Sequence, residues 1–127
     1  VDVVVLNSRA PATLTRNISP AAGHHWLQLV LKGTHSNRDG VGARVEVLAG
    51  GMRLVDEVHS GRGYQSHFGT RLHFGLGACE RVEAVSVRWM GGRTERWDRP
   101  PVDCALTLIE GQGAAVAAPS KSMAQRR

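Results

Sequence analysis

Apolar and polar residues alternate along most of this chain, as they do in β-strands with one buried face. The clearest case is residues 25–32, where Leu27, Leu29 and Leu31 share one face. No segment sustains the i, i+3, i+4 spacing of an amphipathic helix. Short alternating or apolar segments are found at residues 3–6, 13–16, 25–32, 43–49, 53–59, 72–76, 82–90, 94–97 and 105–110. The pattern therefore predicts an all-β chain of about eight or nine short strands.

Turn-forming residues separate these segments at regular intervals. Gly50-Gly51 and Gly91-Gly92 each join two alternating segments, which predicts two β-hairpins. The chain has 15 glycines and 5% aromatic residues, a composition that favours short strands and tight turns. Its 127 residues suffice for one domain with its own core. We expect an antiparallel two-layer β-sandwich, and the pattern leaves a barrel open as the alternative.

The formal net charge of +5 does not by itself indicate nucleic-acid binding. Lys121, Arg126 and Arg127 lie in a final stretch without acidic residues, and the other basic residues are interspersed with acids. Mixed charges are typical of a solvated surface, whereas nucleic-acid binding needs a concentrated basic patch. No apolar run approaches the roughly 20 residues of a membrane-spanning helix. We therefore expect neither a nucleic-acid partner nor a membrane span.

Residues that could support catalysis or metal binding form no recognisable constellation. His24 and His25 are adjacent, so in a strand they point to opposite faces and cannot share an ion. No cysteine or acidic residue lies at a recognised ligand spacing from the histidines. Ser60 and His67 are neighbours only along the chain, and no Gly-x-Ser-x-Gly elbow or phosphate-binding loop is present. We expect no catalytic centre and no cofactor.

Two further features have alternative interpretations. The loop at residues 36–40 faintly resembles a calcium-binding loop, but it lacks the repeated carboxylates and the terminal glutamate of such loops. Asn and Asp in such a loop more often cap their own backbone. Cys79 and Cys104 could pair or stay free, and we expect each to act as a small apolar residue.

Three segments, in order, resemble the ASPIC/UnbV family. The first, at residues 25–45, contains HWL and KGTHSNRDGVGARV; the second, at 60–77, contains SGRGYQS and LHFGLG; the third, at 82–93, is VEAVSVRWMGGR. The resemblance spans roughly residues 24–110. Trp26 and Trp89 are expected to be large anchors of the core. His67-Phe68-Gly69-Thr70 departs from the polar or acidic, proline-containing stretch that is usual there.

The resemblance also implies a domain organisation. Domains of this family typically follow FG-GAP/VCBS repeats, which form a β-propeller in secreted or surface proteins. We therefore expect residues 1–17 to be the remnant of a last propeller repeat, 18–111 to form the sandwich, and 112–127 to be a disordered basic tail. The parent protein is expected to be secreted, periplasmic or on the cell surface, with its own propeller as a partner. Calcium, if bound, would belong to the missing repeats.

The expected function is a non-catalytic binding or scaffolding module with a protein or carbohydrate ligand. Two alternatives stay open: an accessory domain of a propeller enzyme, as in natural-product biosynthesis, and a structural cap of the propeller. Loops at the end of a rigid sandwich are where recognition residues concentrate. The candidate ligand-binding residues are Asn37, Arg38, Asp39, Arg62, Tyr64, His67 and His73.

Overall fold

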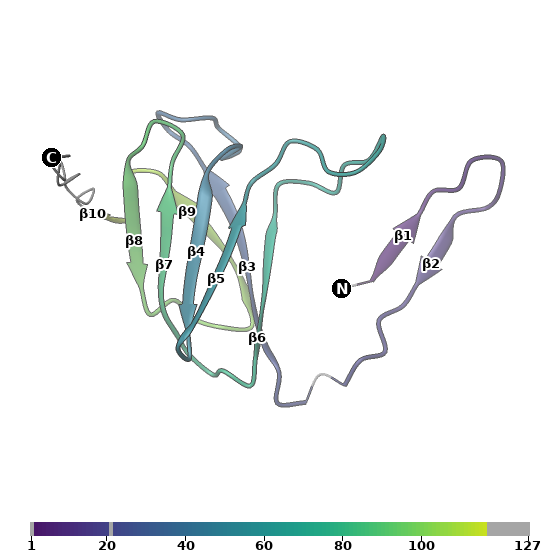
Figure 1. Cartoon of the computed structure of the whole chain (residues 1–127), viewed down its shortest axis with the longest axis horizontal. Coiled ribbons are helices and arrows are strands. Elements are labelled where there is room, and N and C mark those ends of the chain that lie inside the picture. Colours follow the sequence, from purple (N-terminus) through teal and green to yellow (C-terminus); the bar gives the residue numbers. More distant parts are fainter. Residues whose placement is uncertain (1, 21, 117–127) are drawn as a thin grey trace, which may run out of the picture.

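The computed structural model describes residues 2–20 and 22–116, which form ten β-strands and no helix (Figure 1). The strands are β1 (Val3–Val5), β2 (Thr13–Thr15), β3 (His25–Lys32), β4 (Arg44–Ala49), β5 (Met52–Glu57), β6 (Leu72–Gly77), β7 (Val82–Arg88), β8 (Thr94–Asp98), β9 (Cys104–Ile109) and β10 (Ala114–Val116). The all-β prediction is confirmed, with one strand more than expected.

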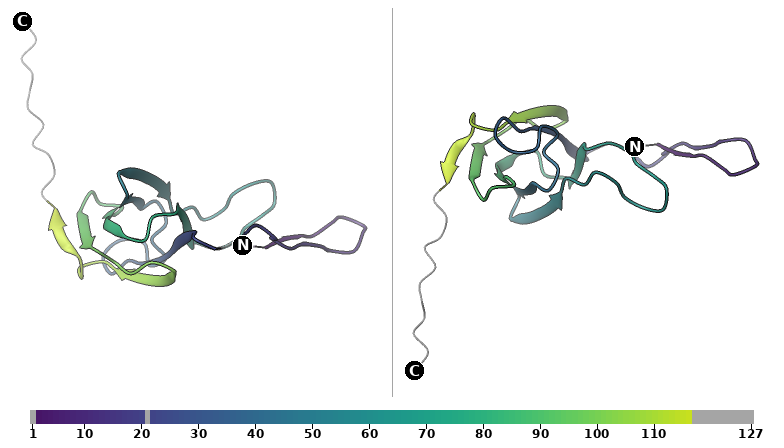
Figure 2. Two further views of the ribbon diagram at one scale, coloured as in Figure 1. Left: turned by 90° about the horizontal axis from the view of Figure 1, so that it is seen from below. Right: turned by 90° about the horizontal axis from the view of Figure 1, so that it is seen from above.

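Two sheets pack face to face and form a sandwich (Figures 1 and 2). One sheet has the strand order β10-β8-β7-β4-β5, and the other has the order β6-β3-β9. No hydrogen-bonded pair joins the two sheets in the described part of the chain, so they do not close into a barrel. The small sheet is mixed, because β9 runs parallel to β3 with Leu27 opposite Cys104. The prediction that all strands would be antiparallel is wrong at this pair, since β9 enters the small sheet by crossing over from β8 in the large one.

The core lies between the two sheets and is built from the alternating apolar residues. Leu27 and Leu29 of β3 face Val45 and Val47 of β4, and all four are completely buried. Burying one such side chain contributes about 1.5–3 kcal/mol, so this interior is the main source of stability. The core excludes Trp26, because its position on β3 is out of phase with the leucines. Its side chain is only half-buried, so the expectation that Trp26 anchors the core is wrong.

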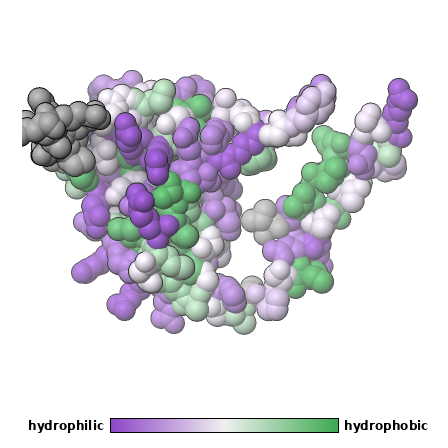
Figure 3. Space-filling model, in the orientation of Figure 1, coloured by the Kyte–Doolittle hydropathy of each residue, from purple (hydrophilic) through white to green (hydrophobic). Residues whose placement is uncertain are grey.

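A separate hairpin precedes the sandwich. Strands β1 and β2 pair antiparallel, with Val4 opposite Leu14, and the turn between them contains Arg9 at a positive φ of 66°. The hairpin stands apart from the sandwich in Figure 1, and its strand residues are all exposed. Figure 3 shows hydrophobic residues uncovered along β1.

The last described strand corrects the expectation of a disordered tail after residue 111. Ala114–Val116 forms β10 and pairs with β8, where Ala115 lies opposite Glu95. This strand is held by backbone pairing, and its small side chains carry no alternating pattern that sequence analysis could detect. The remaining residues of that expected tail, 117–127, lie outside the described residues.

Neither cysteine forms a disulfide in the structure. Cys79 lies after β6 and Cys104 begins β9, and both are partly buried against the core. The Cys79 thiol donates to the carbonyl oxygen of Arg81 over 3.0 Å. Both residues therefore act as small core-packing residues, as expected.

Candidate binding surfaces

The loop at residues 33–42, between β3 and β4, is held in place by a buried carboxylate. Glu110 follows β9, is 5% exposed, and directs Oε2 at three consecutive backbone N–H groups. Thr34 and His35 each donate over 2.9 Å and Ser36 over 2.8 Å, while the Ser36 hydroxyl donates to Oε1 over 2.8 Å. Burial by itself would raise the pKa of Glu110, but the hydrogen bonds outweigh it and lower the pKa to about 2. The loop is thus fastened to the end of β9 by an ionised group.

The predicted site residues of this loop divide into one that braces the backbone and two that face solvent. Asn37 Oδ1 accepts hydrogen bonds from the backbone N–H groups of Asp39, over 3.0 Å, and Val41, over 3.2 Å. The side chains of Arg38 and Asp39 are 90% and 59% exposed and lie 3.6 Å apart. Asn37 is therefore structural, while Arg38 and Asp39 are available to a partner.

The loop at residues 58–71 joins β5 to β6 and projects beyond the sandwich (Figures 1 and 2). Arg62 anchors its base, because Nη2 donates to Asp56 Oδ1 over 2.6 Å and to the Glu57 carbonyl oxygen over 3.0 Å. Tyr64 and Phe68, in contrast, are 88% and 68% exposed. Phe68 is not among the sequence-predicted site residues, although an aromatic residue in a glycine-bearing loop without alternating neighbours is a usable signal.

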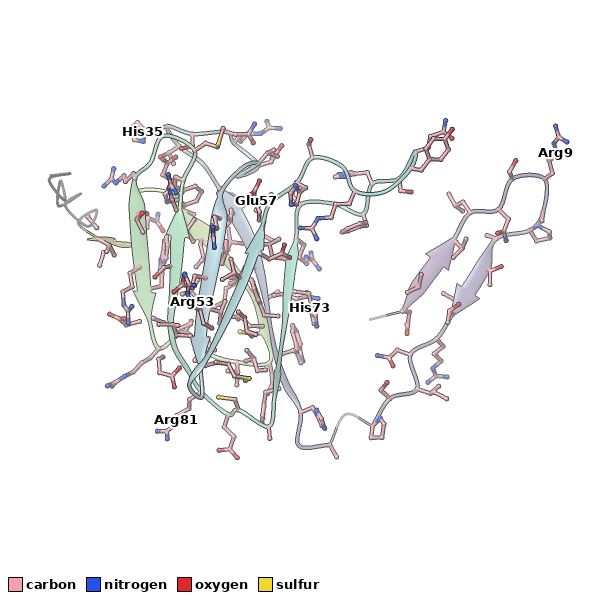
Figure 4. The ribbon with its side chains drawn as sticks, viewed as in Figure 1. Arg9, His35, Arg53, Glu57, His73 and Arg81 are labelled. Carbon is pink, nitrogen blue, oxygen red and sulfur yellow. The ribbon has the colours of Figure 1, made fainter. Side chains whose placement is uncertain are left out.

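Both loops leave the same end of the sandwich, which we call the loop end. Figure 4 shows His35 of the first loop and Glu57, at the base of the second, at that end. The structure thus places Arg38, Asp39, Tyr64 and the exposed His67 on two loops of one end.

His73, the last predicted site residue, does not lie at the loop end. It sits on β6, on the outer face of the small sheet and away from that end (Figure 4). Its ring is stacked with that of Trp26, with centroids 5.9 Å apart and planes 20° apart. Gln28 lies directly opposite His73, and its Nε2 is 3.2 Å from Nδ1 of the histidine. Arg71 Nη1 donates to Gln28 Oε1 over 3.4 Å, which completes a row of four side chains: the small-sheet array.

The hydrogen bonds within the small-sheet array define what it presents to solvent. Arg71 occupies the oxygen of Gln28, so the amide NH₂ faces His73 and donates to its Nδ1. Burial lowers the pKa of His73, which keeps the ring neutral at neutral pH with its proton on Nε2. The array therefore offers an aromatic ring beside N–H donors. The alternation of β3 places Trp26 and Gln28 on one face, but it does not reveal that β6 brings His73 to them.

The described part of the molecule is thus a β-sandwich domain whose distinctive polar and aromatic side chains lie on loops and on open sheet faces. Within residues 2–20 and 22–116, no three His, Cys, Asp or Glu side chains converge as they would around a metal ion. A search of the same residues finds no helix suited to crossing a membrane.

Comparison with known protein families identifies the family of this chain. The family model described as ASPIC and UnbV matches residues 33–115, well over half of the chain. The chain therefore belongs to the ASPIC and UnbV family, and the resemblance predicted from its three segments is confirmed. No curated protein matches the chain. Membership of this family indicates an accessory domain.

Proposed function

We propose that this domain is a non-catalytic binding module that docks a protein partner at its loop end. The supporting observation is the pair of aromatic side chains, Tyr64 and Phe68, exposed by 88% and 68% on the projecting loop. Aromatic and arginine side chains contribute most of the binding energy of protein interfaces. Arg38, on the neighbouring loop of the same end, supplies an exposed cation.

The loop end is largely organised before any partner arrives. Arg62 fixes the base of the projecting loop through Asp56, and Glu110 fixes the neighbouring loop through three backbone N–H groups. A preformed backbone loses less conformational entropy on binding, so more of the contact energy appears as affinity. This arrangement suits recognition better than nucleophilic catalysis, which needs a nucleophile and a base in contact.

The proposal includes a scaffolding role next to a β-propeller in a secreted, periplasmic or cell-surface protein. Val3, Val4 and Leu14 of the separate hairpin are 53%, 64% and 70% exposed. A two-stranded hairpin is only marginally stable in water, and its apolar side chains favour packing against another domain. A preceding propeller blade, which the family resemblance implies, would cover them.

Site-specific photo-crosslinking in the parent protein tests the loop end as a docking surface. Benzoylphenylalanine replaces Tyr64 or Phe68, and the matched control carries it at Met52, which is 42% exposed in the β4–β5 hairpin. The expected result is one shared adduct from positions 64 and 68 and none from position 52. Adducts of equal yield at all three positions, or none at 64 and 68, would contradict the proposal.

A second candidate function is saccharide binding at the small-sheet array. The half-buried Trp26 beside the N–H donors of His73 and Arg71 suits a pyranose ring, which has an apolar face and hydroxyl edges. A panel of methyl pyranosides titrated into ¹⁵N-labelled protein should shift the Trp26 indole and Gly75 amide signals, and Arg71→Ala should weaken that response. Shifts absent for every sugar, or unchanged in the variant, would exclude this function.

A further inference from the structure

The outer face of the five-stranded sheet carries two arginines in direct opposition. Arg44 on β4 is the cross-strand partner of Arg88 on β7. Like charges placed directly opposite each other destabilise a sheet. In the part of the chain that the structure describes, neither guanidinium lies within 4.0 Å of an acidic side chain. The cost of this pairing is therefore not offset by an ion pair among these residues.

The arginine pair lies in a depression that offers further hydrogen-bond donors. Thr94 is opposite Arg88 on β8, so three neighbouring strands contribute to one row. The depression has a volume of about 310 Å³ and is lined by Arg44, Glu46, Arg53, Ser86, Arg88 and Thr94. Its lining holds three arginines and one glutamate, so positive charge is in excess.

Among the described residues, the acidic groups of this face form no ion pair with Arg44 or Arg88, although the charge of Arg44 acts on Glu46 at longer range. Glu46 is engaged by Arg53, whose Nη2 lies 2.5 Å from Oε2; this hydrogen bond lowers the pKa of Glu46 and keeps it ionised. Glu57 is the cross-strand neighbour of Arg44 on the other side, yet it forms no ion pair within residues 2–20 and 22–116. Figure 4 shows Arg53 over this face of the sheet. Arg44 and Arg88 remain free to meet an anion from outside.

We propose that this depression binds a tetrahedral oxyanion, a sulfate or phosphate ester group, between Arg44 and Arg88. Guanidinium groups donate two parallel N–H bonds to such oxygens, and the hydroxyls of Ser86 and Thr94 can donate to the others. An anion between the two cations also relieves their repulsion, so binding and stability increase together. The depression is open on the sheet surface, which leaves room for the group to be part of a larger molecule such as a sulfated polysaccharide. The depression borders the loop end, since Arg44 lies opposite Glu57, but none of the exposed loop residues of that end lines it.

Arg88→Gln should have two opposite effects that together identify the site. It removes the repulsion, so the thermal unfolding temperature of the full chain in sodium chloride should rise above that of the wild type. It should also weaken sulfate binding by about tenfold or more, which corresponds to the loss of one charge-assisted hydrogen bond. Arg44→Gln should behave in the same way. The matched control is Arg81→Gln, which replaces an exposed arginine that forms no ion pair in the described residues.

The measurement is thermal unfolding in sodium sulfate against sodium chloride at equal ionic strength, repeated with inorganic phosphate and with heparin. Sulfate stabilises proteins in general, so the site-specific gain is the saturable part present in the wild type and in Arg81→Gln. Saturation by heparin at lower concentration than by inorganic sulfate identifies a polymer-borne ester group, and saturation by the inorganic ions alone identifies a free anion. Equal gains in all four proteins would overturn the proposal.

Amide chemical shifts provide a second measurement that does not depend on a variant. Sulfate added to ¹⁵N-labelled wild-type protein should shift the signals of Ser86, Arg88 and Thr94 to saturation. Shifts spread evenly over the chain, or confined to other strands, would show that sulfate acts elsewhere.

Discussion

Replacing Glu110 with glutamine tests how the loop at residues 33–42 is held. The substitution keeps the size of the side chain and one carbonyl acceptor, but it removes the negative charge that faces the N–H groups of Thr34, His35 and Ser36. Glu110 is only 5% exposed, so solvent screens these contacts weakly. We expect Glu110→Gln to destabilise the whole domain and to loosen this loop first.

The magnitude follows from the pKa of Glu110, which is lowered from 4.5 to about 2. A difference of one in pKa corresponds to 1.36 kcal/mol, so this lowering favours the charged form of Glu110 by about 3 kcal/mol. Glutamine retains one neutral acceptor, so we expect a loss of about 2–3 kcal/mol in the free energy of unfolding at pH 7. For a domain of this size, such a loss lowers the melting temperature by roughly 10 °C or more.

The pH dependence gives the sharper result. Because the folded-state pKa of Glu110 lies below its unfolded value, its contribution is complete above about pH 4.5 and disappears as the pH falls towards 2. Denaturant unfolding at several pH values between 7 and 3 should show the difference between wild type and Glu110→Gln shrinking with acidification. Glu80→Gln is the control, because Glu80 is exposed and its side chain forms no hydrogen bond or ion pair in the described residues. Equal stability at pH 7, or a difference that stays constant down to pH 3, would refute the explanation.

Three further outcomes follow from the structure. Gly33→Ala should destabilise the same loop, since a Cβ there would lie 2.2 Å from the Asn37 carbonyl oxygen, whereas Gly75→Ala has open space and should change stability little; equal melting temperatures would contradict this. NMR titration should give His73 a pKa below 6.5, so its contribution to stability is present above pH 6.5 and fades as the pH falls. A pKa of His73 above 6.5 would contradict the conclusion that its ring is neutral at neutral pH. Thiol titration of the unfolded protein should count both Cys79 and Cys104 without reductant, and fewer thiols would indicate oxidation.

The strands could be predicted from the sequence because the signal for them is local. Alternation with a period of two depends only on which face of a segment is buried, so residues 25–32 were assigned to a strand without knowledge of any partner. The Gly50-Gly51 turn likewise fixes the hairpin of β4 and β5 through its own positive φ angles. The match to the ASPIC and UnbV family rests on the same linear information.

The pairing of distant strands was decided only by the tertiary structure. Which strands lie beside β3, and in which direction, depends on contacts between residues many positions apart, which alternation does not encode. For that reason alternation predicts the strand that contains His73, but it does not predict that this strand pairs with β3 and stacks His73 on Trp26.

The same limit explains why the contacts of the charged groups could not be predicted from the sequence. Glu110 meets Ser36, which lies 74 positions away in the chain, and Arg44 meets Arg88 only through the β4–β7 register. Sequence supplies the charges and the faces on which they lie, but their electrostatic effect depends on distance and burial, which exist only once the sheets have packed.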